Sequence, residues 1–194
     1  EALAQAVDRP TPGARRQAAR ELARGRSVYE LLAVLQGFVP LAAASSGLPS
    51  GPLPPVVTAE LEVAGKTEVT ELHLHVPADY AAGRPAPLVV AFHGTGGDGA
   101  GMVRMWRGVA ESIGALVLAP TEAGPNDGYR FSERERAAAL AAIRWTRRRF
   151  DVDEDRIFAT GVSRGGHLAW DLALRHPDLF CAIAPMIGSP WITL

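Results

Sequence analysis

Residues 161–166 read GVSRGG, and their spacing places one serine between two glycines. The segment lies between a predicted strand and a predicted helix, and a serine on so tight a turn is forced into strained backbone geometry. Neighbours without side chains are then needed at Gly161 and Gly165. Such a turn would expose the Ser163 hydroxyl beside the N–H groups and positive dipole of a helix N-terminus, where an oxyanion is stabilised. Gly-x-Ser-x-Gly also occurs by chance in ordinary turns, but this strand-turn-helix setting favours a nucleophilic serine.

A second glycine-rich segment, residues 93–97 (HGTGG), directly follows the apolar run 88–92. Glycines there let the backbone curl so that an N–H group can point at a bound carbonyl oxygen. A phosphate-binding loop is the alternative, but the chain contains no G-x-x-x-x-G-K-[ST] pattern, and Lys66 is its only lysine. The two segments, in this order and on these elements, together predict a serine hydrolase site.

The chain resembles the α/β-hydrolase superfamily in these segments. More narrowly, PLVVAFHGTGG (87–97) and DVDEDRIFATGVSRGGHLAWDLALRHPDLFCAIAPMIG (151–188) are similar to the bacterial carboxylesterase, feruloyl-esterase and predicted-peptidase-like group. The resemblance runs from roughly residue 56 to the end of the chain. It implies a serine esterase in which Ser163 is the nucleophile and the backbone N–H groups of Thr95 and Arg164 form the oxyanion hole. It further implies a small-molecule ester substrate, no cofactor and no metal, with loop support from His93, Gly94, Gly96, Gly161 and Gly165.

The sequence departs from this superfamily in the residues that should complete a triad. The triad order is Ser, then an acid, then His, and the last two lie on loops after later strands. Only 31 residues (194 − 163) follow Ser163. His167 lies one helical turn further on, but Asp171, the nearest acid, is predicted to pair with Arg175 at i+4 rather than to orient that imidazole. His176 is predicted to end the helix. We therefore expect the acid and the His beyond the end of this chain, and the chain alone to be inactive.

The remaining pattern predicts an α/β fold with a mostly parallel central sheet, helices on both faces and truncation after about the sixth strand. Residues 1–39 are predicted to form a helical appendage, 40–55 a Pro/Gly/Ser linker, and 56–194 an incomplete α/β-hydrolase domain. The expected strands are 61–63 and 69–76, which form a hairpin, then 88–92, 115–119, 156–160 and 181–187. The expected helices are 102–113, 132–150, which a Ser132–Glu135 capping box opens, and 164–176.

Composition excludes several classes of protein. The chain has 20 basic and 21 acidic side chains, so it offers no electrostatic footprint for nucleic acid. Its longest apolar stretch, 28–44, is interrupted by polar residues and is too short to span a bilayer. A single cysteine, Cys181, excludes an intrachain disulfide, and we expect it to be buried in the last strand. The abundance of Ala, Arg, Gly and Pro is typical of a GC-rich bacterial genome. Localisation and oligomeric state do not follow from this sequence.

Other candidate residues carry weaker signals. His73 and His75 share a strand face; two metal ligands are conceivable there, but two solvent-facing histidines are favoured. Tyr129 and Arg130 follow the end of a strand and are candidates for lining a substrate cleft. The tryptophans expected to be buried or half-buried in helices are Trp106, Trp145 and Trp170. A serine peptidase or a thioesterase of the same fold, and a non-catalytic hydrolase-like domain, remain alternatives to an esterase.

Overall fold

The computed structural model describes residues 56–121 and 129–190, without the side chains of 56–58, and a few residues nearer the N-terminus. The chain divides into two compact units, Glu1–Ala42 and Ala43–Leu194. In the first unit the described residues Ala14, Gln17, Ala18, Arg20 and Glu21 are helical, followed by a turn at Arg24 and Gly25. The Gln17 amide donates a hydrogen bond to Glu21, one helical turn away (3.2 Å). The linker predicted at 40–55 lies outside the described residues, and the domain boundaries stay a prediction.

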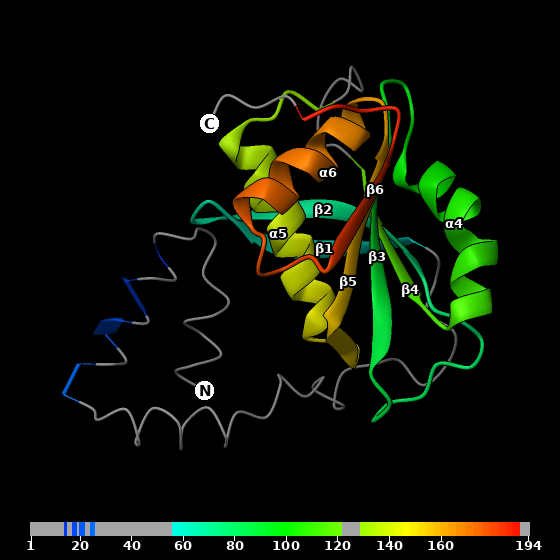
Figure 1. Cartoon of the computed structure of the whole chain (residues 1–194), viewed down its shortest axis with the longest axis horizontal. Coiled ribbons are helices and arrows are strands. Elements are labelled where there is room, and N and C mark those ends of the chain that lie inside the picture. Colours follow the sequence, from blue (N-terminus) through cyan, green and yellow to red (C-terminus); the bar gives the residue numbers. More distant parts are fainter. Residues whose placement is uncertain are drawn as a thin grey trace. The chain divides into compact units, whose positions relative to one another are not determined.

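The second unit is built on a six-stranded sheet with the order β1-β2-β4-β3-β5-β6 (Figure 1). Its strands are β1 (Val56–Val63), β2 (Lys66–His75), β3 (Ala86–Phe92), β4 (Leu116–Pro120), β5 (Val152–Val162) and β6 (Ala182–Met186). The hairpin β1–β2 is antiparallel and joins β4 antiparallel, whereas β4, β3, β5 and β6 are mutually parallel. The predicted α/β fold with a mostly parallel sheet is confirmed.

Helices cover both faces of this sheet. They are α4 (Gly99–Ile113), α5 (Glu133–Arg147) and α6 (Arg164–Arg175). In Figure 1, α5 and α6 lie on one side of the sheet and α4 on the other. Residues of β3 alternate between the two sides: Leu88, Val90 and Phe92 pack in the cluster that includes α5 and α6, and Val89 and Ala91 in the α4 cluster. A strand buried on both faces needs apolar residues at every position, which explains the continuous apolar run.

Capping residues set the starts of α4 and α5. Asp98 caps α4 by accepting a hydrogen bond from the Gly101 N–H (2.7 Å), so this helix begins three residues before the predicted Met102. The capping box predicted for α5 is present: Ser132 Oγ accepts from the Glu135 N–H (3.2 Å), and Glu135 Oε2 accepts from the Ser132 N–H (2.7 Å). The tryptophans of the three helices are half-buried, as predicted.

The prediction that His73 and His75 face solvent is wrong. His73 is only 5% exposed and its Nε2 lies 2.6 Å from Glu71 Oε1, while His75 Nε2 lies 3.0 Å from Glu111 Oε1 on α4. The reason is that α4 packs on this side of β2, so the C-terminal end of the strand, from Leu72 to His75, is covered on both faces. Within the described ranges, no group of three or more His, Cys, Asp or Glu side chains could hold a metal ion.

The prediction of a buried Cys181 is also wrong, because the residue is exposed and precedes the first residue of β6. Its backbone N–H donates to the Ile157 carbonyl (2.9 Å). β6 pairs with β5 along one edge, and in the described part of the chain no further strand pairs with its other edge. The residues of β6 are accordingly half-buried or exposed.

Among the described residues, no helix has both the length and the apolar character needed to cross a membrane.

Candidate active site

Ser163 occupies the junction between β5 and α6 with φ 54° and ψ −117°. A positive φ is unfavourable for any residue with a Cβ, and such residues persist where the surrounding structure holds them. The surroundings here include two main-chain hydrogen bonds: the Ser163 N–H donates to the Met186 carbonyl (3.1 Å), and the Ser163 carbonyl accepts from the His167 N–H (3.0 Å). Ser163 is half-buried at the carboxyl end of β5. This is the strained strand-to-helix turn expected from the spacing of the glycines.

The flanking glycines are sterically required. A Cβ added at Gly161 would lie 2.3 Å from the Gly165 carbonyl carbon and oxygen, and one at Gly165 would lie 2.1 Å from the Phe92 carbonyl oxygen. A Cβ at Gly166 would come within 2.8 Å of the Ile187 carbonyl oxygen. Real Cβ atoms do not approach backbone this closely, so only glycine fits without a backbone shift. The first turn of α6 therefore packs directly against the end of β3.

The loop 93–97 lies beside this turn. A Cβ added at Gly94 would be 3.1 Å from the Val162 carbonyl oxygen and 3.4 Å from the Ser163 Cβ. The loop closes on itself, because the Gly97 N–H donates to the Gly94 carbonyl (3.0 Å) across Gly96, whose φ is +73°. A positive φ at the third residue of a turn is what glycine supplies without strain. The structure thus brings together the two glycine-rich segments, while convergence of the Thr95 and Arg164 N–H groups on one point stays a prediction.

His93 contacts the loop 93–97 at Gly94, and Tyr129 packs against His93. His93 is 1% exposed, its Nδ1 lies 2.8 Å from the Gly94 carbonyl oxygen, and its ring centroid lies 5.1 Å from that of Tyr129. Tyr129 is itself buried, and its hydroxyl donates to the Pro120 carbonyl (3.3 Å). Tyr129 therefore packs in the core instead of lining an open cleft, contrary to expectation. Arg130 is exposed, and its N–H donates to Glu135 (2.8 Å).

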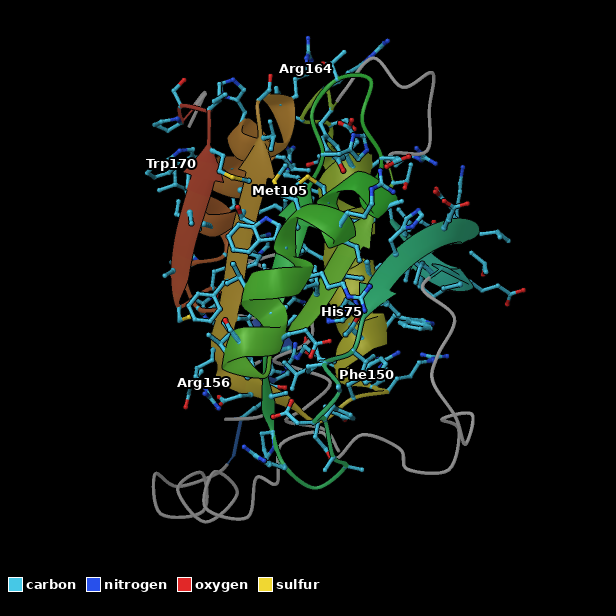
Figure 2. All side chains as sticks on the ribbon, turned by 90° about the vertical axis from the view of Figure 1, so that its right-hand side faces the viewer. His75, Met105, Phe150, Arg156, Arg164 and Trp170 are labelled. Carbon is cyan, nitrogen blue, oxygen red and sulfur yellow. The ribbon has the colours of Figure 1, made fainter. Side chains whose placement is uncertain are left out.

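The side chain of Arg164 has a role that sequence reasoning missed. The sequence analysis assigns a function only to the Arg164 backbone N–H, whereas the structure shows that Arg164 Nη1 also donates a hydrogen bond to the Tyr129 carbonyl at 2.7 Å. The two residues are 35 positions apart, and no periodicity or motif links them. In Figure 2, Arg164 lies at one end of the sheet and Arg156, on β5, at the other, which places this contact at the carboxyl end of the strands.

The titratable residues on α6 are engaged elsewhere. His167 Nδ1 lies against the main chain of Ser189, 3.1 Å from its N and 2.6 Å from its O. Asp171 accepts from Arg175 Nε (2.7 Å), as predicted, and also from Arg136 of α5 (3.1 Å). His176 is buried at the C-terminal cap of α6. Within residues 56–121 and 129–190, the Ser163 hydroxyl makes no hydrogen bond.

A cavity of about 310 Å³ lies at the opposite end of the sheet. Its walls come from residues 79–87, from the last turn of α4 and from Arg156. Since the β3 residues that line it, Ala86 and Pro87, are the first of that strand, the cavity is at the amino ends of the parallel strands. Ser163 is at the carboxyl end of the neighbouring strand, so this cavity does not belong to the site described above.

Comparison with known proteins supplies an independent finding. No protein-family profile matches the chain. The chain is 32% identical over 141 residues to a protein assigned as an esterase, NocK of Nocardia uniformis, covering 67% of this chain and 40% of that protein. It is 29% identical over 127 residues to a protein assigned as feruloyl esterase C of Aspergillus niger, covering 61% and 46% respectively. The chain thus spans less than half the length of these relatives.

A solved structure agrees with this at the level of the fold. The acetyl xylan esterase from Aspergillus awamori superimposes with a TM-score of 0.56 at 21% identity, covering 69% of this chain and 52% of that one. Identity at this level shows a shared fold and leaves the reaction open.

Proposed function

We propose that this chain, a member of the α/β-hydrolase esterase group, carries the nucleophile of a serine hydrolase that cleaves carboxylic esters. The observation that carries the proposal is Ser163 itself: it is the N-cap residue of α6, it holds φ 54°, and its side chain makes no capping hydrogen bond. Serine is normally favoured at this position because its hydroxyl caps the helix. A strained serine that forgoes this bond keeps its hydroxyl available for another partner.

In the proposed reaction, Ser163 Oγ attacks the ester carbonyl carbon while a general base removes its proton. The C=O electrons move onto oxygen, and the Thr95 and Arg164 N–H groups donate to that oxyanion. Collapse of the tetrahedral intermediate breaks the bond to the alcohol oxygen, which leaves with a proton from the same base. The acyl-Ser163 ester is then cleaved by water, giving a carboxylic acid and restoring the serine.

The local fold supports the electrostatic part of this scheme. Arg164 is the first residue of α6, so its N–H lies at the positive end of the helix dipole and has no intrahelical acceptor. Thr95 lies in the loop whose Gly94 would touch Ser163 Cβ if it carried a side chain. Donors about 2.7–3.1 Å from the developing oxyanion would stabilise it best. The base and its acid are expected outside the described residues, since Ser163 Oγ has no side-chain partner among them.

The proposed substrate is a small-molecule ester of a carboxylic acid. The name of one sequence relative is a feruloyl esterase and that of one structural neighbour is an acetyl xylan esterase; these names share the ester bond and differ in the acyl group. The acyl group is therefore left open, and short activated esters are the suitable first probes.

The test is hydrolysis of p-nitrophenyl acetate and p-nitrophenyl butyrate by two forms of the protein: this chain, and a form that carries any sequence following residue 194. We expect turnover in the longer form and loss of about four orders of magnitude on Ser163→Ala. Ser112→Ala, at an exposed serine of α4 whose hydroxyl donates to Val109, is the matched control and should leave turnover unchanged. Full activity of the Ser163→Ala form would disprove the proposed nucleophile. Robust, Ser163-dependent turnover by the shorter chain would instead assign the base to His167 or His176.

A further inference from the structure

Tyr129 is held at three separate points around the candidate site. Its carbonyl accepts a hydrogen bond from Arg164 Nη1 (2.7 Å), and its hydroxyl donates to the Pro120 carbonyl at the end of β4 (3.3 Å). Its ring packs edge-on against Phe92 (centroids 5.9 Å, 86° between planes) and lies 5.1 Å from the His93 ring. Since Tyr129 is 4% exposed, its position is fixed by these contacts and by close packing.

The Arg164 side chain places a charged donor on a backbone carbonyl. It is half-buried at the start of α6, and within the described residues its side chain has no carboxylate partner; its hydrogen bond is to the neutral Tyr129 carbonyl. A hydrogen bond from a charged donor is roughly twice as strong as one between neutral groups. Arg164, which makes this charged hydrogen bond, directly follows the strained Ser163.

The contacts continue from Tyr129 to the other glycine-rich segment. The Tyr129 ring packs on His93, whose Nδ1 lies 2.8 Å from the Gly94 carbonyl oxygen. That same carbonyl accepts the Gly97 N–H that closes the loop (3.0 Å). A shift of Tyr129 would therefore displace a fully buried imidazole and the carbonyl on which the loop is built.

We propose that the Arg164 side chain is a positioning group, which holds the Tyr129 carbonyl and thereby fixes the Gly94–Gly97 loop relative to the turn that carries Ser163. This inference rests on the proposed function of Ser163. The two proposed oxyanion donors, the N–H groups of Thr95 and Arg164, lie at opposite ends of this series of contacts. A displacement of about 1 Å between them would cost up to about 100-fold in rate, because hydrogen bonds to a transition state depend steeply on geometry.

The competing explanation is direct packing. Gly94 runs so close to Val162 and Ser163 that this contact alone could set the spacing between the loop and the turn. In that case Arg164 would stabilise only the segment that begins at Tyr129, and the loop would not respond to its removal. The two explanations make opposite predictions for the same variants.

The first measurement needs no activity. Hydrogen–deuterium exchange of peptides covering residues 93–98 is compared for the parent chain, Arg164→Met and Arg164→Lys. We expect Arg164→Met to raise exchange in this loop about 10-fold, the loss expected for one hydrogen bond from a charged donor, and Arg164→Lys, which keeps a donor and its charge, to restore most of the protection. Arg175→Met is the matched control, because it removes another arginine from α6 that bonds to Asp171 instead. Unchanged exchange in Arg164→Met, or an equal rise in Arg175→Met, would overturn the proposal.

A double-mutant cycle tests the route through Tyr129. Tyr129→Leu removes the ring that contacts His93, and we expect it to raise loop exchange in a similar way. Because both changes break the same series of contacts, Arg164→Met should add little in the Tyr129→Leu background. Fully additive effects would show that the two residues act on the loop independently and would contradict the proposed route.

The second measurement uses the form that hydrolyses p-nitrophenyl esters. We expect Arg164→Met to lower kcat by about 10- to 100-fold with little change in KM, since the affected contacts act on the transition state, and Arg164→Lys to recover part of the loss. If Ser163→Ala leaves hydrolysis intact, the proposed function fails, while the exchange data still decide whether Arg164 positions the loop. If exchange responds and kcat does not, the loop is positioned by Arg164 but does not stabilise the transition state, which overturns the catalytic half of the inference.

Discussion

Two strand-to-helix connections leave the carboxyl ends of the neighbouring parallel strands β3 and β5, and they begin their helices in opposite ways. Before α4, Asp98 has an extended backbone (φ −148°, ψ 170°), and its carboxylate accepts the Gly101 N–H. Before α6, Ser163 has φ 54°, and its side chain makes no capping hydrogen bond. The first connection stabilises its helix through a side-chain cap, whereas the second has no such cap and holds its N-cap residue at a strained φ.

The two connections nevertheless share close packing. A Cβ at Gly99, the first residue of α4, would lie 2.2 Å from the Ala119 carbonyl oxygen, much as one at Gly165 would lie 2.1 Å from that of Phe92. Close approach of a helix to a sheet thus explains the glycine at both positions, and no catalytic role is needed to account for either. What distinguishes the β5–α6 connection is the strained and uncapped serine, so that residue, more than the glycines around it, marks the candidate site.

The largest expected effect tests the shared feature. Gly165→Ala and Gly99→Ala should each lower the free energy of unfolding by about 3 kcal/mol, because the new methyl group meets backbone that cannot move away cheaply. Gly108→Ala is the matched control: it lies within α4, nothing would touch its Cβ within 4 Å, and it should stabilise the helix by about 0.5–1 kcal/mol. Urea denaturation followed by circular dichroism measures all three. A mild effect at Gly165 with a severe one at Gly99 would show that the two connections do not share this constraint.

The next effect tests where the strain lies. Ser163→Gly should raise the free energy of unfolding by about 1 kcal/mol, because glycine adopts a positive φ without the cost that serine bears. Asp98→Gly, made at the equivalent position of the relaxed connection, should instead lower it by a few tenths of a kcal/mol. The same denaturation experiment gives both values. Destabilisation by Ser163→Gly would mean that the serine conformation is not strained, and the contrast between the two connections would then fail.

The features of the site and of the fold that could be predicted from the sequence depend on neighbouring residues in the chain. The glycine spacing around Ser163 and the Ser132–Glu135 pair each act within a few residues, so a short stretch of sequence contains the whole physical cause. The continuous apolar run of β3 likewise predicts a strand buried on both faces, because burial requires an apolar side chain at each position.

The features that were mispredicted depend on what packs from elsewhere. His73 and His75 alternate with apolar residues as on a half-exposed strand, and the position of α4 leaves His73 buried and His75 half-buried. The start of α4 was missed because two of its first three residues, Gly99 and Gly101, have low helix propensity, which the Asp98 cap and the contact with the sheet override. The Arg164–Tyr129 hydrogen bond joins residues 35 positions apart and leaves no pattern along the chain.

The smallest expected change in stability is that of Ser163→Ala, for which Asp98→Ala is the matched comparison. Asp98→Ala should lower the free energy of unfolding by about 1 kcal/mol, since the Gly101 N–H loses its acceptor at the helix start. Ser163→Ala should change it by less than about 0.5 kcal/mol, because its hydroxyl has no hydrogen bond to lose among the described residues and alanine keeps the same unfavourable φ. The pair also separates stability from chemistry, since Asp98→Ala should retain ester hydrolysis in the active form whereas Ser163→Ala should abolish it. Denaturation and p-nitrophenyl ester turnover measured on the same preparations test both halves. A Ser163→Ala form that loses as much stability as Asp98→Ala would show that the Ser163 hydroxyl has a structural role, and the availability of that hydroxyl for catalysis would lose its support.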